Sequence, residues 1–305
     1  MAAAATGFSM APPPNSIEET AIPIPCKVNL RLAVGSRRAD GYHDIDTFFL
    51  PLPEPSDAFY IRRFDEPGTI DFTCSDPELE TDDNLVVRAY RAFAAATGFS
   101  PRLEVGLKKR IPHGAGLGGG SSDAAAMLRY LNDRAGSAAL PETALSDLAL
   151  ALGADVPFFL LGCPAMASGV GERLVPTDPG LAGWFAAVVC PAAKVRTAWA
   201  YAALDAARTF PTKLGGEFLT SVFEANKRAF CVTGAPLRND FEPVVFAAHP
   251  ELGRVKERLL ALGAAGALLS GTGSAVFGLF RHRHTAALAL ADLSGNGPRT
   301  FLAPL

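Results

Sequence analysis

Apolar and polar positions alternate along residues 23–35, the segment PIPCKVNLRLAVG, which begins the patterned part of the chain. A period of two is typical of a β-strand, because successive side chains point to opposite faces. The apolar side chains predicted to share one face are Val28, Leu30, Leu32 and Val34. The other face carries Lys27, Asn29 and Arg31, so the strand is predicted to present polar groups side by side.

The rest of the chain mixes strand and helix patterns. Strand-like runs, bounded by Pro, Gly, Asp and Ser, cover residues 44–52, 58–64, 68–74, 102–108, 184–191, 267–271 and 274–280. Helical spacing predicts helices over residues 84–97, 141–152, 243–262 and 286–293, and one beginning at Ser121 or Ser122 as N-cap. Pro141 suits a first helical position. This mixture predicts an α/β fold of the α+β two-layer type.

A length of 305 residues favours two domains. The composition loosens over residues 165–180, which predicts domains over residues 21–167 and 168–305. Residues 1–20 carry no Lys or Arg and include three consecutive prolines, so we predict a disordered tail. The tail has neither the basic start of a signal peptide nor an Arg-rich amphipathic pattern, so a cytoplasmic location is expected.

The segment GAGLGGGSS, from Gly114 to Ser122, comes directly before a predicted helix. Glycines permit positive φ angles and let the backbone approach a ligand closely. The unpaired N–H groups at a helix start and the helix dipole favour an anion there. We therefore predict that this segment binds a phosphate chain, with a flexible turn without ligand as the alternative.

Two common nucleotide motifs fit this glycine segment poorly. Gly114, Gly116 and Gly119 match the spacing of the dinucleotide fingerprint, but the acidic residue about 20 positions on, Asp133, falls at a helix end rather than after a second strand. No Gly-Lys-Ser or Gly-Lys-Thr occurs in the chain, which excludes a Walker A loop. A lysine that serves this site must therefore come from elsewhere.

Lys27 is the leading candidate for that lysine, although a solvated outer-face residue is the plainer interpretation of its pattern. Asp155 lies among apolar residues, in GADVPFF, where burial of a carboxylate requires a cation or hydrogen-bond donors. A pair of Lys27 and Asp155 would satisfy both charges and place a base beside a cation. The alternative for Asp155 is a carboxylate bonded to N–H groups at a helix end.

Three other clusters of residues need an interpretation. Tyr42 could stack on a planar base and His43 could hydrogen-bond its edge, or both could belong to a plain surface turn. The segment LSGTGS, residues 269–274, again allows close backbone approach. The segment RHRH, residues 281–284, is predicted to be a solvated basic patch rather than a metal site, because its histidines are too close for one helical face.

The charge balance constrains the partners. The chain has 28 Lys and Arg against 31 Asp and Glu, a net charge of −3, which disfavours nucleic acid or an acidic membrane as the main partner. A span without charge, residues 259–280, is long enough to cross a bilayer, but its glycines and polar centre favour a loop between buried elements. Five scattered cysteines favour reduced thiols over a disulfide framework. The partners are expected to be small molecules.

Several motifs in order resemble one family: PCKVNL, ADGYHDIDT, IPHGAGLGGGSSDAAAML, LGADVPFFLLG, ASGVGERL and LLSGTGSAVF. Their order and spacing over residues 22–280 resemble the GHMP kinase superfamily and, within it, the kinases of 4-diphosphocytidyl-2-C-methyl-D-erythritol in the non-mevalonate isoprenoid route. The resemblance implies an N-terminal domain like domain 2 of ribosomal protein S5 and a ferredoxin-like C-terminal domain. It also implies transfer of the ATP γ-phosphate to the substrate's 2-hydroxyl, with Mg²⁺, in a monomer or homodimer.

The resemblance also implies site residues. Asp155 would be the base and Lys27 its partner. ATP would bind Pro112, His113, Gly114, Ala115, Gly116, Leu117, Gly118, Gly119, Gly120, Ser121 and Ser122. The acceptor would contact Asn29, Tyr42, His43, Thr197, Gly271, Thr272 and Gly273. By analogy, Ser121 or Ser122 would hold Mg²⁺.

The chain departs from that family pattern at two positions. Cys26 stands where a small residue such as Ala is usual, and Arg31 where an apolar residue is more common. The alternatives are a GHMP kinase for another small alcohol, such as homoserine or a mevalonate derivative, and a nucleotide-binding relative without catalysis. ADGYH favours the cytidine substrate, and the presence of both Lys27 and Asp155 disfavours an inactive relative.

Overall fold

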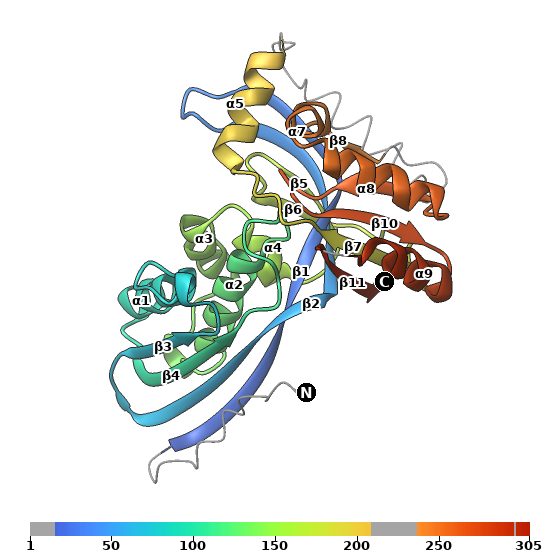
Figure 1. Ribbon diagram of the computed structural model, residues 1–305. Helices are drawn as coiled ribbons and strands as arrows, with labels where there is room; N and C mark the ends of the chain where they lie inside the picture. The colour runs from blue at the N-terminus through green and yellow to red at the C-terminus, as the bar shows by residue number, and fades with distance from the viewer. Residues whose placement is uncertain (1–15, 209–236, 296) are drawn as a thin grey trace.

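The computed structural model describes residues 16–208, 237–295 and 297–305 and contains two β-sheets (Figure 1). The first sheet has seven strands in the order β3-β4-β2-β1-β8, with β5 paired to β2 and β6 to β5. Its strands are β1 Ser16–Arg37, β2 His43–Pro67, β3 Ile70–Cys74, β4 Pro101–Lys108, β5 Ala165–Ser168, β6 Arg173–Pro176 and β8 Arg238–Asn239. The second sheet, in the order β11-β7-β10-β9, consists of β7 Phe185–Cys190, β9 Gly266–Leu269, β10 Val276–Phe280 and β11 Arg299–Pro304. The predicted α/β architecture is therefore confirmed.

Helices cover the outer faces of both sheets (Figure 1). Beside the first sheet lie α1 Leu85–Thr97, α2 Gly119–Asn132, α3 Glu142–Leu152 and α4 Val156–Leu161. Beside the second sheet lie α8 Pro250–Ala261 and α9 Arg283–Leu293, while α7 Glu242–Ala248 packs on α8, and α5 Thr197–Ala207 packs on α7 near the turn between β1 and β2 (Figure 1). Within the described ranges, no helix combines the length and apolar character that crossing a bilayer requires.

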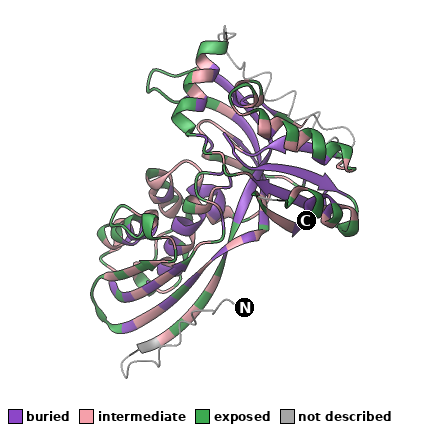
Figure 2. Ribbon diagram, in the orientation of Figure 1, coloured by how far each residue is buried: buried purple, intermediate pink, exposed green. Residues whose placement is uncertain are grey.

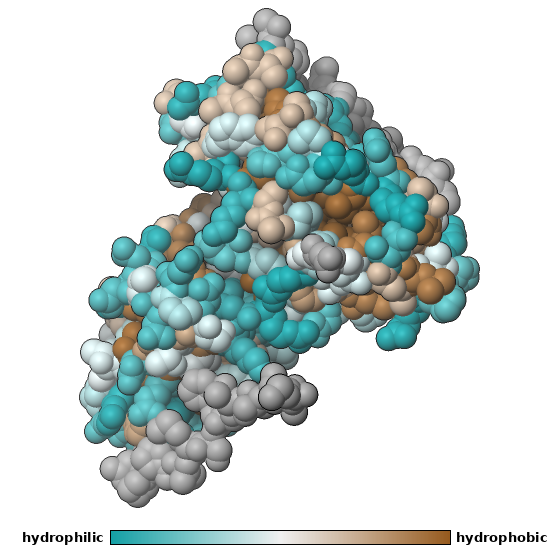
Figure 3. All heavy atoms as spheres, viewed as in Figure 1, coloured by the Kyte–Doolittle hydropathy of each residue, from teal (hydrophilic) through white to brown (hydrophobic). Residues whose placement is uncertain are grey.

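The core follows from strand alternation. Along β7, Ala187 and Val189 face the helices of the second sheet, whereas Ala186 and Val188 face the first sheet. The two sheets thus share a middle layer of apolar side chains, which Figure 2 shows as buried ribbon where the strands meet. On the face seen in Figure 3, mostly hydrophilic residues cover α1 to α3, as expected for the outer surface of helices packed on a sheet.

Both faces of β1 are buried over residues 26–35, which the alternating pattern did not predict. Lys27, Asn29 and Arg31 are 4%, 2% and 6% exposed, so the interpretation of Lys27 as a solvated residue is wrong. Polar side chains at such depth need partners. Here the partners lie on β2 and in the loop after β9. The polar face of β1 therefore lies between the two halves of the molecule rather than in solvent.

The glycine segment begins its helix earlier than predicted. Helix α2 begins at Gly119, with Gly118 in left-handed conformation as N-cap, so neither Ser121 nor Ser122 caps it. Pro141 is likewise the N-cap of α3 rather than its first residue. Asn84 caps α1 through a bond from Val86 N, and this helix ends at Thr97 as predicted, followed by Gly98 in left-handed conformation.

Longer segments also differ from prediction. The runs 44–52 and 58–64 form the single strand β2. The predicted helix 243–262 is two helices that break at His249, because the residue before Pro250 is disfavoured in helical conformation. The pattern did not predict α5. In the predicted tail, residues 1–15 lie outside the described residues, but residues 16–20 belong to β1, where Glu18 pairs with Arg134.

The predicted domain boundary at 167/168 falls at the end of β5. The next strand, β6, still pairs with β5 in the first sheet, and the second sheet begins with β7. Strand β8, far along the sequence, returns to the first sheet beside β1. The two domains therefore remain a prediction, while the sheets themselves interleave along the chain.

Candidate active site

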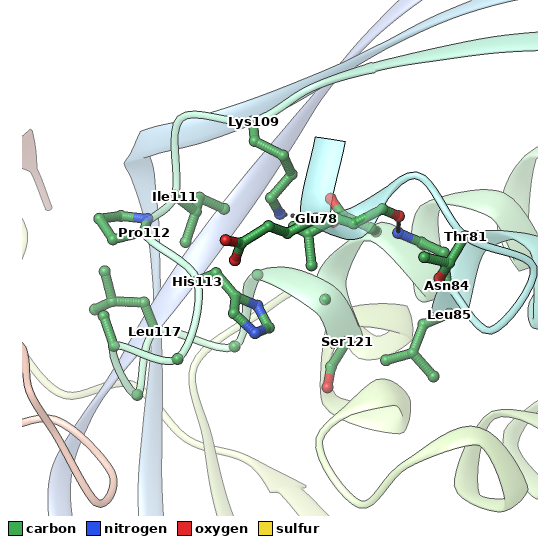
Figure 4. A pocket seen from close by; sticks show the side chains of 18 of the residues that line it. Glu78, Thr81, Asn84, Leu85, Lys109, Ile111, Pro112, His113, Leu117 and Ser121 are labelled. Carbon is green, nitrogen blue, oxygen red and sulfur yellow. Dashed lines mark hydrogen bonds and ion pairs between the residues drawn. The ribbon is translucent and has the colours of Figure 1, made fainter. Parts of the chain in front are cut away.

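The glycine segment forms the wall of a cavity of about 370 Å³ (Figure 4). Gly114, Gly116 and Gly118 have φ angles of 69°, 78° and 73°, which side chains rarely adopt, so the glycines are required by the shape of the loop. All predicted loop residues from Pro112 to Ser121 line this cavity. The N-terminus of α2 opens onto it, and in the described chain no side chain caps that end. Its N–H groups are thus available to an anion.

A buried ionic cluster supports the start of this loop. Asp57, which is fully buried, accepts hydrogen bonds from Arg110 N (2.5 Å) and Ile111 N (2.9 Å) and pairs with Lys109. Lys109 also pairs with Asp123 at 2.8 Å. Burial raises the pKa of Asp123 to about 7, although Lys109 opposes this shift. Figure 4 shows Lys109 reaching in from the end of β4 toward the loop. Neither Asp57 nor Asp123 was predicted as a site residue from the sequence.

The predicted pair of Lys27 and Asp155 is present. Lys27 Nζ lies 3.5 Å from Asp155 Oδ2, donates to Asn29 Oδ1 at 2.8 Å, and lies 5.2 Å from the centre of the Phe49 ring. Asp155 occupies the N-cap of α4, but in the described structure its side chain makes no capping bond there, which removes the alternative of a purely local role. Its side chain is 31% exposed, so the carboxylate is only partly buried. One carboxylate edge therefore remains accessible to a reactant.

Polar groups of β1 and β2 hold Lys27 and its neighbours in place. Asn29 Nδ2 donates to Thr47 Oγ1 at 2.7 Å, and this hydroxyl donates to Arg31 O at 2.6 Å. Arg31 in turn pairs with Asp46 at 3.4 Å. This network explains why a polar residue at position 31 is tolerated where the family pattern has an apolar one: its charge is neutralised inside the protein.

A second cavity, of about 790 Å³, adjoins the first. It is lined by residues of β1, the turn before β2, the start of α4, helix α5 and the loop after β9, including Lys27, Asn29, Tyr42, His43, Asp155, Thr197, Tyr201, Asp205, Gly271 and Thr272. The surface in Figure 3 is hollowed on the side where α5 faces α3 and α4. Thr197 and Thr272 approach to 3.3 Å between their hydroxyl oxygens. Gly273 shapes the loop at φ 92° without lining the cavity.

Aromatic and polar groups gather at one end of this second cavity. The His43 ring stacks on Tyr201 with centroids 4.9 Å apart, and His43 Nε2 lies 2.8 Å from Asp205 Oδ1. Tyr42, 63% exposed, stands at the rim. Burial raises the pKa of Tyr201 to about 12. Tyr201 and Asp205 were not predicted as site residues, although they follow Thr197 at helical spacing of four, a signal that could have revealed them.

The two cavities meet beside the ion pair. Gly116, Gly118 and Ser121 line both. A Cβ on Gly118 would lie 3.1 Å from Lys27 Cγ, and one on Gly271 would lie 3.7 Å from Lys27 Nζ. Lys27 is thus enclosed between the two glycine segments, next to the helix end that suits phosphate. A group held in the first cavity and an alcohol held in the second would meet near Asp155.

Within residues 16–208, 237–295 and 297–305, no group of three or more His, Cys, Asp or Glu side chains is arranged to hold a metal ion. Of the two predicted serines, Ser121 lines both cavities, whereas Ser122 is 2% exposed and lines neither in the described structure. Of these two serines, only Ser121 therefore reaches the cavities. The RHRH segment is exposed, as predicted for a basic patch.

Comparison with known proteins first defines the class. The model of the GHMP kinases N terminal domain matches residues 84–163, and that of the GHMP kinases C terminal matches residues 223–299. A homoserine kinase from Cytophaga hutchinsonii has the same fold, with a TM-score of 0.67 over 98% of both chains at 17% identity. The two domain matches and this fold together define the class as that of the GHMP kinases.

Closer relatives then identify the particular family. The chain is 77% identical to the 4-diphosphocytidyl-2-C-methyl-D-erythritol kinase of Solidesulfovibrio magneticus over 97% of its length and 100% of the relative. It is 49% identical to that of Nitratidesulfovibrio vulgaris, over 90% and 95%. A crystal structure of 4-(cytidine 5'-diphospho)-2C-methyl-D-erythritol kinase matches with a TM-score of 0.73 and 38% identity, over 93% and 98%. The chain belongs to the 4-diphosphocytidyl-2-C-methyl-D-erythritol kinase family.

Proposed function

We propose that this chain transfers the γ-phosphoryl group of ATP to the 2-hydroxyl of 4-diphosphocytidyl-2-C-methyl-D-erythritol. The observation that carries the proposal is the position of the Lys27–Asp155 pair at the junction of two cavities. One cavity is built around a helix N-terminus and suits a polyphosphate, and the other ends in aromatic rings and suits a base. The names of the relatives support the same reaction.

In the proposed reaction, Asp155 accepts the proton of the acceptor hydroxyl. The hydroxyl oxygen then bonds to the γ-phosphorus while the bond from this phosphorus to the β,γ-bridging oxygen breaks, and ADP leaves with that oxygen. Lys27 lies 3.5 Å from Asp155 and holds this carboxylate in place beside the acceptor. Its positive charge also lies beside the loop where negative charge is concentrated, which stabilises the transition state.

The glycine loop positions the nucleotide. N–H groups at the start of α2 would donate to phosphate oxygens, and the ties of Asp57 to Arg110 N and Ile111 N hold the loop entrance rigid. A rigid loop avoids reorganisation during the reaction, so its hydrogen bonds stabilise the transition state at little cost. This role accounts for the glycine-rich sequence without a Walker lysine.

Mg²⁺ would supply charge neutralisation on the phosphate oxygens when bound. The residues present fit this ion, because Mg²⁺ usually retains several waters and takes few protein ligands beside substrate phosphates. Ser121 is the residue that would hold it, since its hydroxyl lies in the first turn of α2 and lines both cavities.

The second cavity would hold the cytidine end of the acceptor. Tyr42 at the rim offers an exposed ring face for stacking, and Tyr201 supports the His43 ring from beneath. Thr197, Thr272 and Asn29 would provide polar contacts nearer the reacting end. His43 is oriented by Asp205 and can read the edge of a base.

Turnover tests the proposal directly. The purified chain would be incubated with ATP, Mg²⁺ and 4-diphosphocytidyl-2-C-methyl-D-erythritol, with ADP followed in a coupled assay and the product by ³¹P NMR. We expect one new phosphomonoester signal per ADP formed. Homoserine and mevalonate serve as comparison acceptors, and preference for either of them over the cytidine compound would overturn the proposed acceptor. ATP binding without turnover of any acceptor would overturn the proposed catalysis.

A further inference from the structure

A buried asparagine outside both cavities is tied to the catalytic groups. Asn239 ends the two-residue strand β8, which runs parallel to β1 with Asn239 opposite Leu32. It is 4% exposed, and it is not among the described residues that line the two cavities. A buried polar side chain requires partners, so the hydrogen bonds of Asn239 show what it does.

The Asn239 amide uses both donors and its acceptor. Nδ2 donates to Leu269 O at 2.8 Å and to Gly271 O at 2.7 Å, and Oδ1 accepts from Phe241 N at 2.9 Å. A primary amide carries two N–H donors on its nitrogen and an acceptor oxygen on the same carbon, and Asn239 uses all three. The loop after β9 is thereby held to β8 at two carbonyls on either side of Ser270.

The same loop holds the ion pair from the other side. Gly271 N donates to Asn29 Oδ1 at 3.0 Å, and this oxygen also accepts from Lys27 Nζ at 2.8 Å. Since Asn29 Nδ2 donates to Thr47 Oγ1, the amide orientation of Asn29 is settled by its partners. Gly271 thus helps to aim an oxygen at the lysine that faces Asp155.

We propose that Asn239 is a positioning residue for phosphoryl transfer, which acts through Gly271 and Asn29 on Lys27. The inference rests on the proposed function only in taking turnover as its readout. When the amide is lost, the two carbonyls of the loop lose their donors, Gly271 moves, and Lys27 is no longer held against Asp155. Catalysis then declines although every group that touches a substrate is still present.

Nucleotide binding should depend less on Asn239. The phosphate loop has anchors of its own, because Leu117 O accepts from Lys27 N at 2.9 Å and Asp57 binds its entrance. The loop after β9 also contacts it, through Ser270 Oγ to Gly116 O at 2.9 Å and Ala275 N to Ala115 O at 3.0 Å, so a small rise in the KM for ATP is expected when this loop loosens. We therefore expect kcat to change much more than the KM for ATP.

The first test compares Asn239→Asp with Asp240→Asn. The first variant keeps the shape but turns the donating atom into an oxygen that faces two carbonyls. The second alters the next buried residue, which accepts from Val34 N and pairs with Arg208 and Arg238, away from the glycine loop. We expect Asn239→Asp to lower kcat about 30-fold with the KM for ATP within about threefold. We expect Asp240→Asn to keep kcat within about twofold of wild type, even if its melting temperature falls as much as that of Asn239→Asp.

Equal losses of kcat in the two variants, or none in Asn239→Asp, would overturn the proposal. If Asn239→Asp does not fold, Asn239→Ser removes the amide without adding charge, and the same expectations apply to it.

A double-mutant cycle separates positioning from general destabilisation. In an Asn29→Ala background the path to Lys27 is already cut, so Asn239→Asp should lower kcat by less than about threefold there. Fully additive losses would show that Asn239 does not act through Asn29.

A measurement without substrate keeps this inference distinct from the proposed function. Amide hydrogen exchange over residues 269–275 should accelerate at least tenfold in Asn239→Asp and remain near wild type in Asp240→Asn. Unchanged exchange would refute the positioning role. Wild-type protein that turns over no acceptor would refute the proposed function instead, while the exchange result would still stand.

Discussion

The contact between the two glycine segments leads to a sharp prediction. A Cβ added to Gly116 would lie 2.1 Å from Ser270 O and 3.2 Å from Gly273 N, in a backbone with φ 78°. Gly114 has nearly the same conformation, φ 69°, but no described atom lies within 4 Å of its added Cβ. Gly116→Ala and Gly114→Ala therefore share the backbone strain and differ only in the clash.

The structure sets the expected magnitudes. Left-handed strain costs about 1 kcal/mol in either variant, or about 3 °C in melting temperature for a chain of this size. In Gly116→Ala the backbone oxygen must also move away by about 1 Å to reach an ordinary contact distance. A displacement of about 1 Å at a reacting centre costs about 100-fold in rate. We expect kcat/KM to fall about 100-fold in Gly116→Ala and about threefold or less in Gly114→Ala.

Steady-state kinetics with both substrates varied, together with thermal unfolding, would measure these effects. A second cost of about 1–3 kcal/mol from overpacking should lower the melting temperature of Gly116→Ala further. If the two variants lost activity equally, the loops would not touch as described, and the reasoning about their contact would fail.

Three further predictions follow from other contacts. Asp155→Asn should lower kcat by about 10²- to 10⁴-fold with the KM for ATP nearly unchanged, and full activity in this variant would contradict its assigned role as base. Asp205→Asn should raise the KM for the cytidine acceptor about fivefold with kcat within about twofold, because His43 loses a charged partner; a drop in kcat alone would speak against this role. Hydrogen bonding to Arg134 lowers the pKa of Glu18 to about 2 from 4.5. The ionised Glu18 therefore stabilises the folded protein fully above about pH 4.5, and this stabilisation is lost as the pH falls toward 2. Glu18→Gln should therefore destabilise the protein by about 1 kcal/mol at pH 7 and not at pH 2, as measured by urea unfolding at both pH values.

Local patterns predicted part of the fold well. The glycine segment, the extent of α1 and most strands depend on neighbouring residues, so they could be predicted from the sequence. The single strand β2 was missed because prolines within it resemble loop residues, and the break at His249 because apolar spacing continues across it. Helix α5 was missed because its apolar positions form no clear stripe, and much of it borders a cavity instead of a core.

Some site residues could be predicted because their chemistry is unusual for their position. Asp155 among apolar residues and Lys27 on an apolar strand each require a partner, and pairing them was the simplest solution. Asp57 and Asn239 carry no such signal, since an Asp or Asn near prolines and charged residues is typical of a surface loop. Their roles became clear only from the backbone groups that they bind.

The sequence by itself determined that a glycine turn leads into an open helix start at residues 114–122, because positive φ angles follow from local glycines. Tertiary structure alone decided what that turn faces. The bond from Gly271 to Asn29 joins residues 242 positions apart, and the contact of His43 with Asp205 spans 162. Such contacts depend on how the two sheets stack and on where β8 returns beside β1. Because burial of side chains from the whole chain decides both of these arrangements, no local sequence pattern predicts the contacts.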